Sequence, residues 1–180
     1  DHLPDLGTAM RTLGVRGLNV TVPHKQGVMA IVDELSEAAQ RIGAVNTIVR
    51  DGDRLLGDNT DAYGIAASLR EDGGLTDLPS KVVLLGAGGA ARAVLHAVLE
   101  DSNVEEVWVL NRTLDRARQL VDELGRGRAT AGQLGDTGPV QEAGLLINCS
   151  SVGLAPDVDV SPMGDGTGLH RDMVVVDIVY

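Results

Sequence analysis

Hydrophobic and polar residues change their spacing near the middle of the chain. Before this point, residues 17–23 alternate apolar and polar side chains, which predicts a strand. The apolar residues of segment 26–41 recur at helical spacing, which predicts a helix. Further expected elements are a strand over 44–50, a hairpin turn at Asp51-Gly52 into a strand over 54–57, and a helix over 62–70 that Asp58 to Asp61 would cap.

After residue 80, short apolar runs alternate with helical segments. The expected strands are 81–85, 105–110, 145–150 and 173–179, and the expected helices are 90–100 and 113–124. Fully apolar strands that alternate with helices are typical of a doubly wound parallel sheet, covered on both faces. Residues 71–80 combine glycines, a proline and polar residues, which indicates a break in the chain. We therefore expect a two-domain α/β protein, with residues 1–73 in the first domain and 74–180 in the second.

The composition excludes several classes of partner. The 180 residues carry 26 acidic and 15 basic side chains, a formal charge of −11, which disfavours binding to nucleic acid or to anionic membranes. The longest apolar runs are too short to span a bilayer. The single cysteine, Cys149, allows no intrachain disulfide and is compatible with a reducing cytoplasm. No metal site is predicted. The acidic surface with few lysines is typical of a halophilic protein and equally of an acidic protein from a GC-rich genome.

A glycine motif follows the first apolar strand of the second half. Gly86-Ala87-Gly88-Gly89-Ala90-Ala91 has the spacing G-x-G-x-x-A between an expected strand and an expected helix. Gly86 would permit the tight turn, Gly88 would let a diphosphate approach the backbone, and Ala91 would let the helix pack closely on the strand. Free N–H groups at the helix start would bind the diphosphate. In this context the motif predicts a dinucleotide site of the Rossmann type, although the same residues alone also form simple glycine turns.

The end of the next strand indicates which dinucleotide binds. Asn111-Arg112-Thr113 follows this strand, and Arg116 lies one helical turn further on. Two guanidinium groups and a hydroxyl suit the 2′-phosphate of NADP, whereas a site for NAD usually carries a carboxylate there. One alternative is that Thr113 caps the helix and that Arg112 is solvated. Another is that Arg112 and Arg116 pair with Asp115 or Asp122.

Polar residues gather at the ends of the strands expected in the first half: Asn19, Thr21, Lys25, Asn46, Asn59, Thr60 and Asp61. Lys25 is one of only two lysines, and an amine can exchange a proton where a guanidinium cannot. Asp61, if it lies near Lys25, would orient the ammonium group for general acid–base catalysis. The alternative is a surface lysine and an aspartate that caps its own helix.

Three segments of the first half resemble motifs of the shikimate dehydrogenase family. They are Gly17-Leu18-Asn19-Val20-Thr21-Val22-Pro23-His24-Lys25, Gly43-Ala44-Val45-Asn46-Thr47 and Gly57-Asp58-Asn59-Thr60-Asp61. The resemblance continues through the glycine motif, through Asn111 to Arg116, and through Asp177-Ile178-Val179-Tyr180. These motifs run in family order over essentially the whole chain.

The resemblance implies a cytoplasmic enzyme that reduces 3-dehydroshikimate to shikimate with NADPH, a step toward chorismate and the aromatic amino acids. Lys25 matches the catalytic lysine and Asp61 the catalytic aspartate beside it. The implied substrate contacts are Thr21, Asn46, Asp61 and Tyr180. The implied cofactor contacts are Glu37, Gly86, Ala87, Gly88, Gly89, Ala90, Asn111, Arg112, Thr113, Arg116 and Ile178.

Some features of the family are absent or changed. The family's serine-containing loop lies upstream of Asp1 and its glutamine-containing segment lies beyond Tyr180, so we expect a chain that is incomplete at both ends. Position 62 is alanine where glycine is usual. Two alternatives stay open: a quinate/shikimate dehydrogenase of wider specificity, and a non-catalytic sensor that binds NADP. The expected partner is a small-molecule substrate, and the sequence is compatible with a homodimer.

Overall fold

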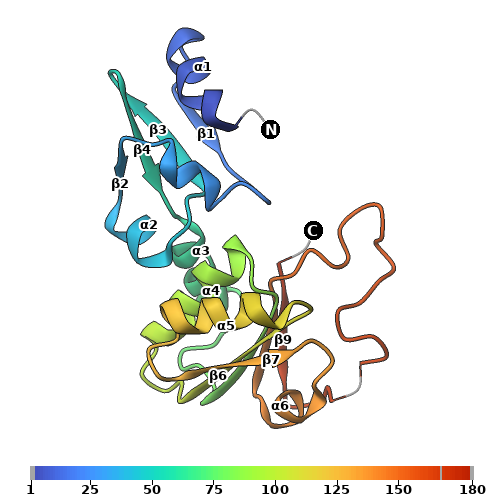
Figure 1. Cartoon of the computed structure of the whole chain (residues 1–180). Coiled ribbons are helices and arrows are strands. Elements are labelled where there is room, and N and C mark those ends of the chain that lie inside the picture. Colours follow the sequence, from blue (N-terminus) through green and yellow to red (C-terminus); the bar gives the residue numbers. More distant parts are fainter. Residues whose placement is uncertain (1–2, 167, 179–180) are drawn as a thin grey trace.

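The computed structural model describes residues 3–166 and 168–178, and it contains two separate β-sheets (Figure 1). The first sheet has the order β1-β3-β4-β2. β3 pairs antiparallel with β1 and β4, and β2 runs parallel to β4. Its strands are β1 (Gly17–Asn19), β2 (Glu34–Leu35), β3 (Thr47–Asp51) and β4 (Arg54–Asp58), and its helical segments are η1 (Leu3–Asp5), α1 (Leu6–Thr12), η2 (Gly27–Ala30) and α2 (Glu37–Ile42). The hairpin predicted at Asp51-Gly52 is confirmed.

The helix predicted over residues 26–41 is wrong. The segment folds instead as η2, β2 and α2, because its middle pairs with the edge of β4. Asp33 makes two hydrogen bonds with Leu55 of β4: its backbone N–H donates to Leu55 O, and its carboxylate accepts from Leu55 N. Ser36 then begins a new helix, and its hydroxyl accepts a hydrogen bond from Ala39 N at 3.1 Å. Pairing with a strand edge has therefore overridden the helical spacing of the apolar residues.

Two predicted strands of the first half are shorter than expected. β1 ends at Asn19 rather than at residue 23, and β3 begins at Thr47 rather than at residue 44. The residues cut from these strands remain tied to the sheet, because Val20 N donates to Asn46 O at 2.7 Å. The two strand ends therefore carry Thr21, Lys25 and Asn46 on irregular backbone beside one another.

The second sheet confirms the predicted doubly wound α/β fold. All five strands are parallel, in the order β7-β6-β5-β8-β9. They are β5 (Lys81–Leu85), β6 (Glu106–Asn111), β7 (Ala129–Gln133), β8 (Leu145–Asn148) and β9 (Val174–Asp177), and the helices are α3 (Asp61–Glu71), α4 (Gly89–Glu100), α5 (Leu114–Leu124) and α6 (Thr137–Glu142). β7 and α6 were not predicted from the sequence.

Side chains on the two faces of β5 belong to two different cores. Val82 and Leu84 pack in the core that includes α4 and α5, whereas Val83 and Leu85 pack in the core that includes Val140 of α6. A strand buried on both faces must be apolar at every position, which is why residues 82–85 read as one apolar run. No helix in the described part of the chain has the length and apolarity needed to cross a membrane.

The glycine motif lies where the strand order of the second sheet reverses. From β5 the chain moves outward through α4 to β6 and β7, and it then returns to β8 on the other side of β5. In open α/β sheets such a reversal opens a crevice at the carboxyl ends of the strands, where ligands bind. The fold therefore places residues 86–91 at this crevice.

The two sheets are joined through α2, α3 and α4, which lie between them (Figure 1). Ile42, Ala44 and Ala93 form a small buried cluster here, with Ala38 and Ala62 packed against it. α3 also contributes Ile65 and Leu69 to the core of the second sheet. The glycine-motif helix α4 is therefore in direct contact with the segment that leads to Asn46.

Candidate active site

Lys25, Asp61 and Asn46 meet in one hydrogen-bonded group, as the sequence predicts for the first two. Lys25 Nζ donates to Asp61 Oδ2 at 2.7 Å, and Asn46 Nδ2 donates to Asp61 Oδ1 at 2.7 Å. Both oxygens of the carboxylate are therefore held. The Lys25 side chain is 12% exposed and that of Asp61 is 30% exposed, so the pair is accessible to a small molecule without being surrounded by water.

The backbone around Asp61 is fixed by amide side chains. Asn59 is 4% exposed; its Nδ2 donates to Ala44 O at 2.9 Å and its Oδ1 accepts from Asp61 N at 3.0 Å. Thr60 N donates to Asn46 Oδ1 at 3.0 Å. Asp61 is also the first residue of α3, where the helix dipole favours a negative charge. Asn59 and Asn46 thus lock the carboxylate in one orientation.

Lys25 lies at the boundary between the two halves of the molecule. Its carbonyl accepts a hydrogen bond from Val45 N at 2.7 Å, which ties it to the first sheet. Its aliphatic stem packs on Gly89 of α4, where an added Cβ would lie 2.9 Å from Lys25 Cβ. The amine is therefore brought from one half of the chain to the glycine motif of the other.

The glycine motif has the shape that a diphosphate needs. Gly86 has a φ of +106°, and an added Cβ would lie 2.9 Å from Ser150 N, so no larger residue fits this turn. Gly88 caps α4 without any side-chain cap bond, and an added Cβ there would meet no atom within 4 Å. Ala91 is fully buried against the sheet. The open space at Gly88 and the helix start without a side-chain cap bond fit a dinucleotide diphosphate.

The two arginines after β6 are available to an anion. In the described part of the structure, the guanidinium groups of Arg112 and Arg116 make no hydrogen bond or ion pair, and Asp115 pairs with Arg118 instead, at 3.0 Å. Thr113 occupies the N-cap of α5, but its side chain makes no cap bond. The predicted pairing of these arginines with Asp115 or Asp122 is therefore absent among the described residues, whereas an exposed Arg112 is also what the other alternative predicts. Asn111 Nδ2 donates to Thr113 O at 2.8 Å and shapes the turn.

Among the described residues, Glu37, Thr21 and Ile178 make none of the contacts given above. Glu37 is 78% exposed and pairs with Arg41 on the surface of α2, at 2.5 Å. Thr21 is exposed, four residues before Lys25 in the chain. Ile178 follows β9, and its N–H donates to Asn148 O at 3.3 Å. Tyr180 lies outside the described residues.

Sequence reasoning missed a polar cluster at the ends of β8 and β9. Asn148 is 3% exposed; its Nδ2 donates to Asp177 Oδ1 at 3.0 Å, and its Oδ1 accepts from Ser150 Oγ at 2.7 Å. Ser150 N lies next to Gly86, so the cluster borders the glycine motif. The signal was available, because polar residues directly after buried parallel strands gather at one edge of the sheet.

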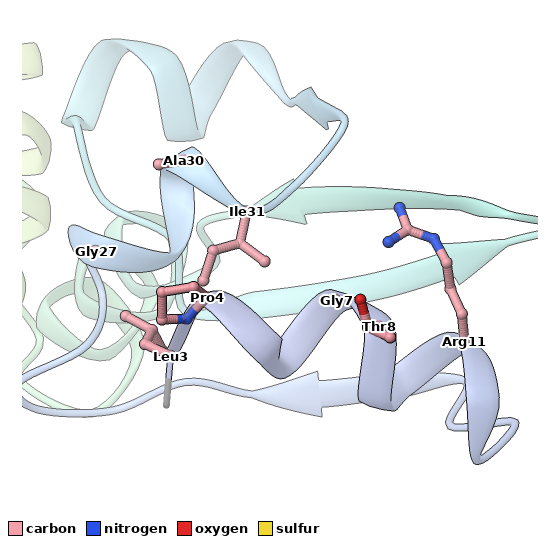
Figure 2. Close-up of a pocket in the computed structure, with 8 residues that line it drawn as sticks. All are labelled: Leu3, Pro4, Gly7, Thr8, Arg11, Gly27, Ala30 and Ile31. Carbon is pink, nitrogen blue, oxygen red and sulfur yellow. The ribbon is translucent and has the colours of Figure 1, made fainter. Parts of the chain in front are cut away.

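A cavity of about 350 Å³ lies between α1 and η2, and none of the site residues described above lines it (Figure 2). Its lining residues are Leu3, Pro4, Gly7, Thr8, Arg11, Gly27, Ala30 and Ile31. Arg11 is its one charged side chain, and its guanidinium is already held by Asp33 at 2.6 Å and by Asp53 O at 2.8 Å. The charged side chain in the lining of this cavity is therefore already paired.

Comparisons with known proteins match both halves of the chain. The shikimate dehydrogenase substrate binding domain matches residues 1–48, and the shikimate / quinate 5-dehydrogenase family matches residues 74–178. A shikimate dehydrogenase (NADP(+)) of Symbiobacterium thermophilum is 42% identical over 179 residues, which is 95% of this chain and 60% of the relative. The chain thus spans about three fifths of the length of that relative.

Two solved structures extend the likeness to three dimensions. Shikimate 5-dehydrogenase from Thermus thermophilus, in complex with NADP(H) and shikimate, is 40% identical with a TM-score of 0.81, over 99% of this chain and 63% of that one. Quinate dehydrogenase from Corynebacterium glutamicum, in complex with NAD, is 32% identical with a TM-score of 0.85, over 99% of this chain and 64% of that one. The motif resemblance is confirmed: the chain belongs to the shikimate / quinate 5-dehydrogenase family.

Proposed function

We propose that the protein catalyses the reversible NADPH-dependent reduction of 3-dehydroshikimate to shikimate. The observation that carries the proposal is the Lys25–Asp61 pair, with its 2.7 Å hydrogen bond, packed against Gly89 of the glycine motif. A proton donor held beside a dinucleotide-binding helix is what a carbonyl reduction requires. A protein that only binds the dinucleotide has no use for such a pair.

The proposal divides the work between two domains. Residues 1–73 would bind the substrate and residues 74–180 would bind NADP. Gly86, Ala87, Gly88, Gly89 and Ala90 would hold the diphosphate through the start of α4, and Asn111, Arg112, Thr113 and Arg116 would hold the 2′-phosphate. The family resemblance adds Glu37 and Ile178 as cofactor contacts. NADP, when bound, supplies or accepts the hydride.

Lys25 and Asp61 would manage the proton. Lys25 Nζ would donate a proton to the oxygen of the C3 carbonyl as that oxygen becomes an alcohol, and it would accept the proton in the reverse reaction. Asp61 Oδ2 keeps the ammonium group in place, and Asn46 holds Asp61 Oδ1 from the other side. Thr21, Asn46, Asp61 and Tyr180 would bind the substrate.

NADP is proposed over NAD because of the charges after β6. Arg112 and Arg116 carry no partner among the described side chains, and the nearest carboxylate along α5, Asp115, is occupied by Arg118. Two free guanidinium groups attract the doubly charged 2′-phosphate, which NAD lacks. A cytoplasmic location and a homodimer stay predictions from the sequence.

Quinate is the alternative substrate. The similarity to the quinate dehydrogenase structure, with a TM-score of 0.85, favours testing it directly. Quinate and shikimate both carry a secondary hydroxyl that the Lys25 amine would deprotonate, so the same mechanism would apply to either one.

The test is oxidation of shikimate by the full-length protein with NADP, followed as NADPH absorbance, with quinate and NAD as parallel substrates. Turnover with shikimate and NADP well above every other combination is the expected result. Faster turnover of quinate would make quinate the substrate instead of shikimate. A preference for NAD would make NAD the cofactor instead of NADP. Binding of NADPH with no turnover of either acid would overturn the enzymatic proposal in favour of a sensor.

A further inference from the structure

Arg92 is a charged residue buried at the junction of the two halves of the molecule. Its side chain is 7% exposed, and no buried polar side-chain atom in the described structure lacks a hydrogen-bond partner. A buried guanidinium group is costly unless its donors are satisfied, and removal of a partner is strongly destabilising. Its contacts therefore determine where the surrounding elements can lie.

These contacts come from both halves. Arg92 Nε donates to Ile42 O at 2.6 Å, at the end of α2 in the first half. Arg92 Nη2 pairs with Glu123 Oε2 of α5 at 2.7 Å, in the second half. Hydrogen bonds from Gln119 and from Arg92 lower the pKa of Glu123, so the carboxylate stays charged. Arg92 thus joins a backbone carbonyl of one half to a carboxylate of the other.

The guanidinium also packs tightly on Gly43. An added Cβ at Gly43 would lie 2.4 Å from Arg92 Nη2, and Gly43 has a φ of +69°. The positive φ favours glycine at this position, and a Cβ there would push the guanidinium group away. Gly43 is the C-cap of α2, so the C-terminal end of α2 lies in contact with the Arg92 guanidinium group.

Arg92 stands one helical turn after Gly88 of the glycine motif, and Gly43 stands three residues before Asn46. Arg92 N donates to Gly88 O at 3.1 Å within α4. On the other side, Ala44 O accepts from Asn59 and Val45 N donates to Lys25 O. A short rigid path therefore runs from the start of α4, through Arg92, to the backbone that holds Lys25 and Asn46.

We propose that Arg92 is a positioning residue, which sets the distance between the Lys25–Asp61 pair and the dinucleotide held by the start of α4. The inference rests on the proposed function and concerns its geometry, because Arg92 touches neither group itself. Proton and hydride must be delivered to the same carbonyl group. A displacement of about 1 Å between their donors can cost on the order of 10²-fold in rate.

The test compares Arg92→Met and Arg92→Lys with Arg128→Met in the full-length protein. Arg128 is the matched control, because it also donates to backbone carbonyls, Val104 O at 2.7 Å and Asp101 O at 3.3 Å, within the second half. The measurements are kcat and KM for shikimate, Kd for NADPH, the primary isotope effect on oxidation of shikimate deuterated at C3, and Tm. All kinetics are run well below the lowest Tm.

Arg92→Met is expected to lower kcat by about tenfold or more and to raise the isotope effect, with Kd for NADPH changed less than about threefold. Arg92→Lys retains the charge and one donor, so its kcat should fall between those of the wild type and Arg92→Met. Arg128→Met should lower Tm and leave kcat and the isotope effect unchanged. A purely structural role would give Arg92→Met the same profile as Arg128→Met, and that result would overturn the inference. An inactive wild type would instead refute the proposed function beneath it.

Discussion

Gly89→Ala should reduce catalysis without reducing stability. Gly89 is the first residue of α4, and it lies against the stem of Lys25. An added Cβ would lie 2.9 Å from Lys25 Cβ and 3.2 Å from Lys25 Cδ. The clash falls on the root of the lysine side chain, which cannot swing away as its tip could. The whole residue must therefore move.

The size of the effect follows from these distances. Carbon atoms pack at about 3.5–4.0 Å, so Lys25 must retreat by roughly half an ångström or more. Since a misplacement of about 1 Å can cost on the order of 10²-fold, we expect kcat to fall about tenfold, or about 1.4 kcal/mol of transition-state stabilisation. Alanine is also a better helix former than glycine by up to about 1 kcal/mol, which offsets the cost of the contact in the folding free energy.

Gly64→Ala is the matched control for this substitution. Gly64 lies within α3, and an added Cβ there would meet no atom within 4 Å. It should gain up to about 1 kcal/mol in stability and keep the wild-type kcat. Both variants are measured by urea unfolding and by shikimate oxidation at saturating NADP. If Gly89→Ala keeps kcat within about twofold of wild type, the contact with Lys25 does not position the amine and the reasoning is refuted.

Three further substitutions test separate parts of the structure. Arg112→Ala should raise KM for NADPH and reduce the preference for NADP over NAD, because a free guanidinium near the 2′-phosphate is lost; an unchanged cofactor ratio would reject this role. Asn59→Ala leaves Ala44 O and Asp61 N without their buried partner and should cost about 2–4 kcal/mol of unfolding free energy in urea; a loss below about 1 kcal/mol would show that water replaces the amide. Burial lowers the pKa of His96; Glu100 opposes this shift, and Arg126 and Arg41 add to it. The unfolded chain therefore takes up a proton on His96 at a higher pH than the folded protein does. Stability should therefore decrease as the pH drops from about 6.5 through the lower folded pKa, and His96→Gln should flatten this part of the curve; identical pH profiles of Tm would contradict it.

The fold of the second half was largely readable from the sequence. Residues 81–85 form β5 as predicted, because a strand buried on both faces must be apolar throughout. β7 was missed because Thr130 and Gln133 interrupt its apolar residues, and α6 was missed because it has only six residues and contains Pro139. In the first half, the helix predicted over 26–41 was wrong, because Glu34 and Leu35 in the middle of this segment pair with β4.

The site was predictable by residue type and less so by geometry. The chemistry of an amine and a carboxylate predicted that Lys25 and Asp61 would act together, and the structure contains a hydrogen bond between them. Arg92 was not singled out, because in the sequence it reads as one more charge on an amphipathic helix. Its importance depends on Ile42 and Gly43, which lie far from it in the chain. Long-range contacts of this kind leave no local pattern.

The two lysines of the chain provide the most direct test of the central claim, that Lys25 transfers the proton. Lys81 is the matched control, because it pairs with Glu142 at the amino end of β5, whereas the glycine motif follows the carboxyl end. NADP-dependent shikimate oxidation should fall by about 10²–10⁴-fold in kcat for Lys25→Ala, with NADPH affinity nearly unchanged, and it should stay at the wild-type rate for Lys81→Ala. A near-wild-type kcat for Lys25→Ala would contradict the account.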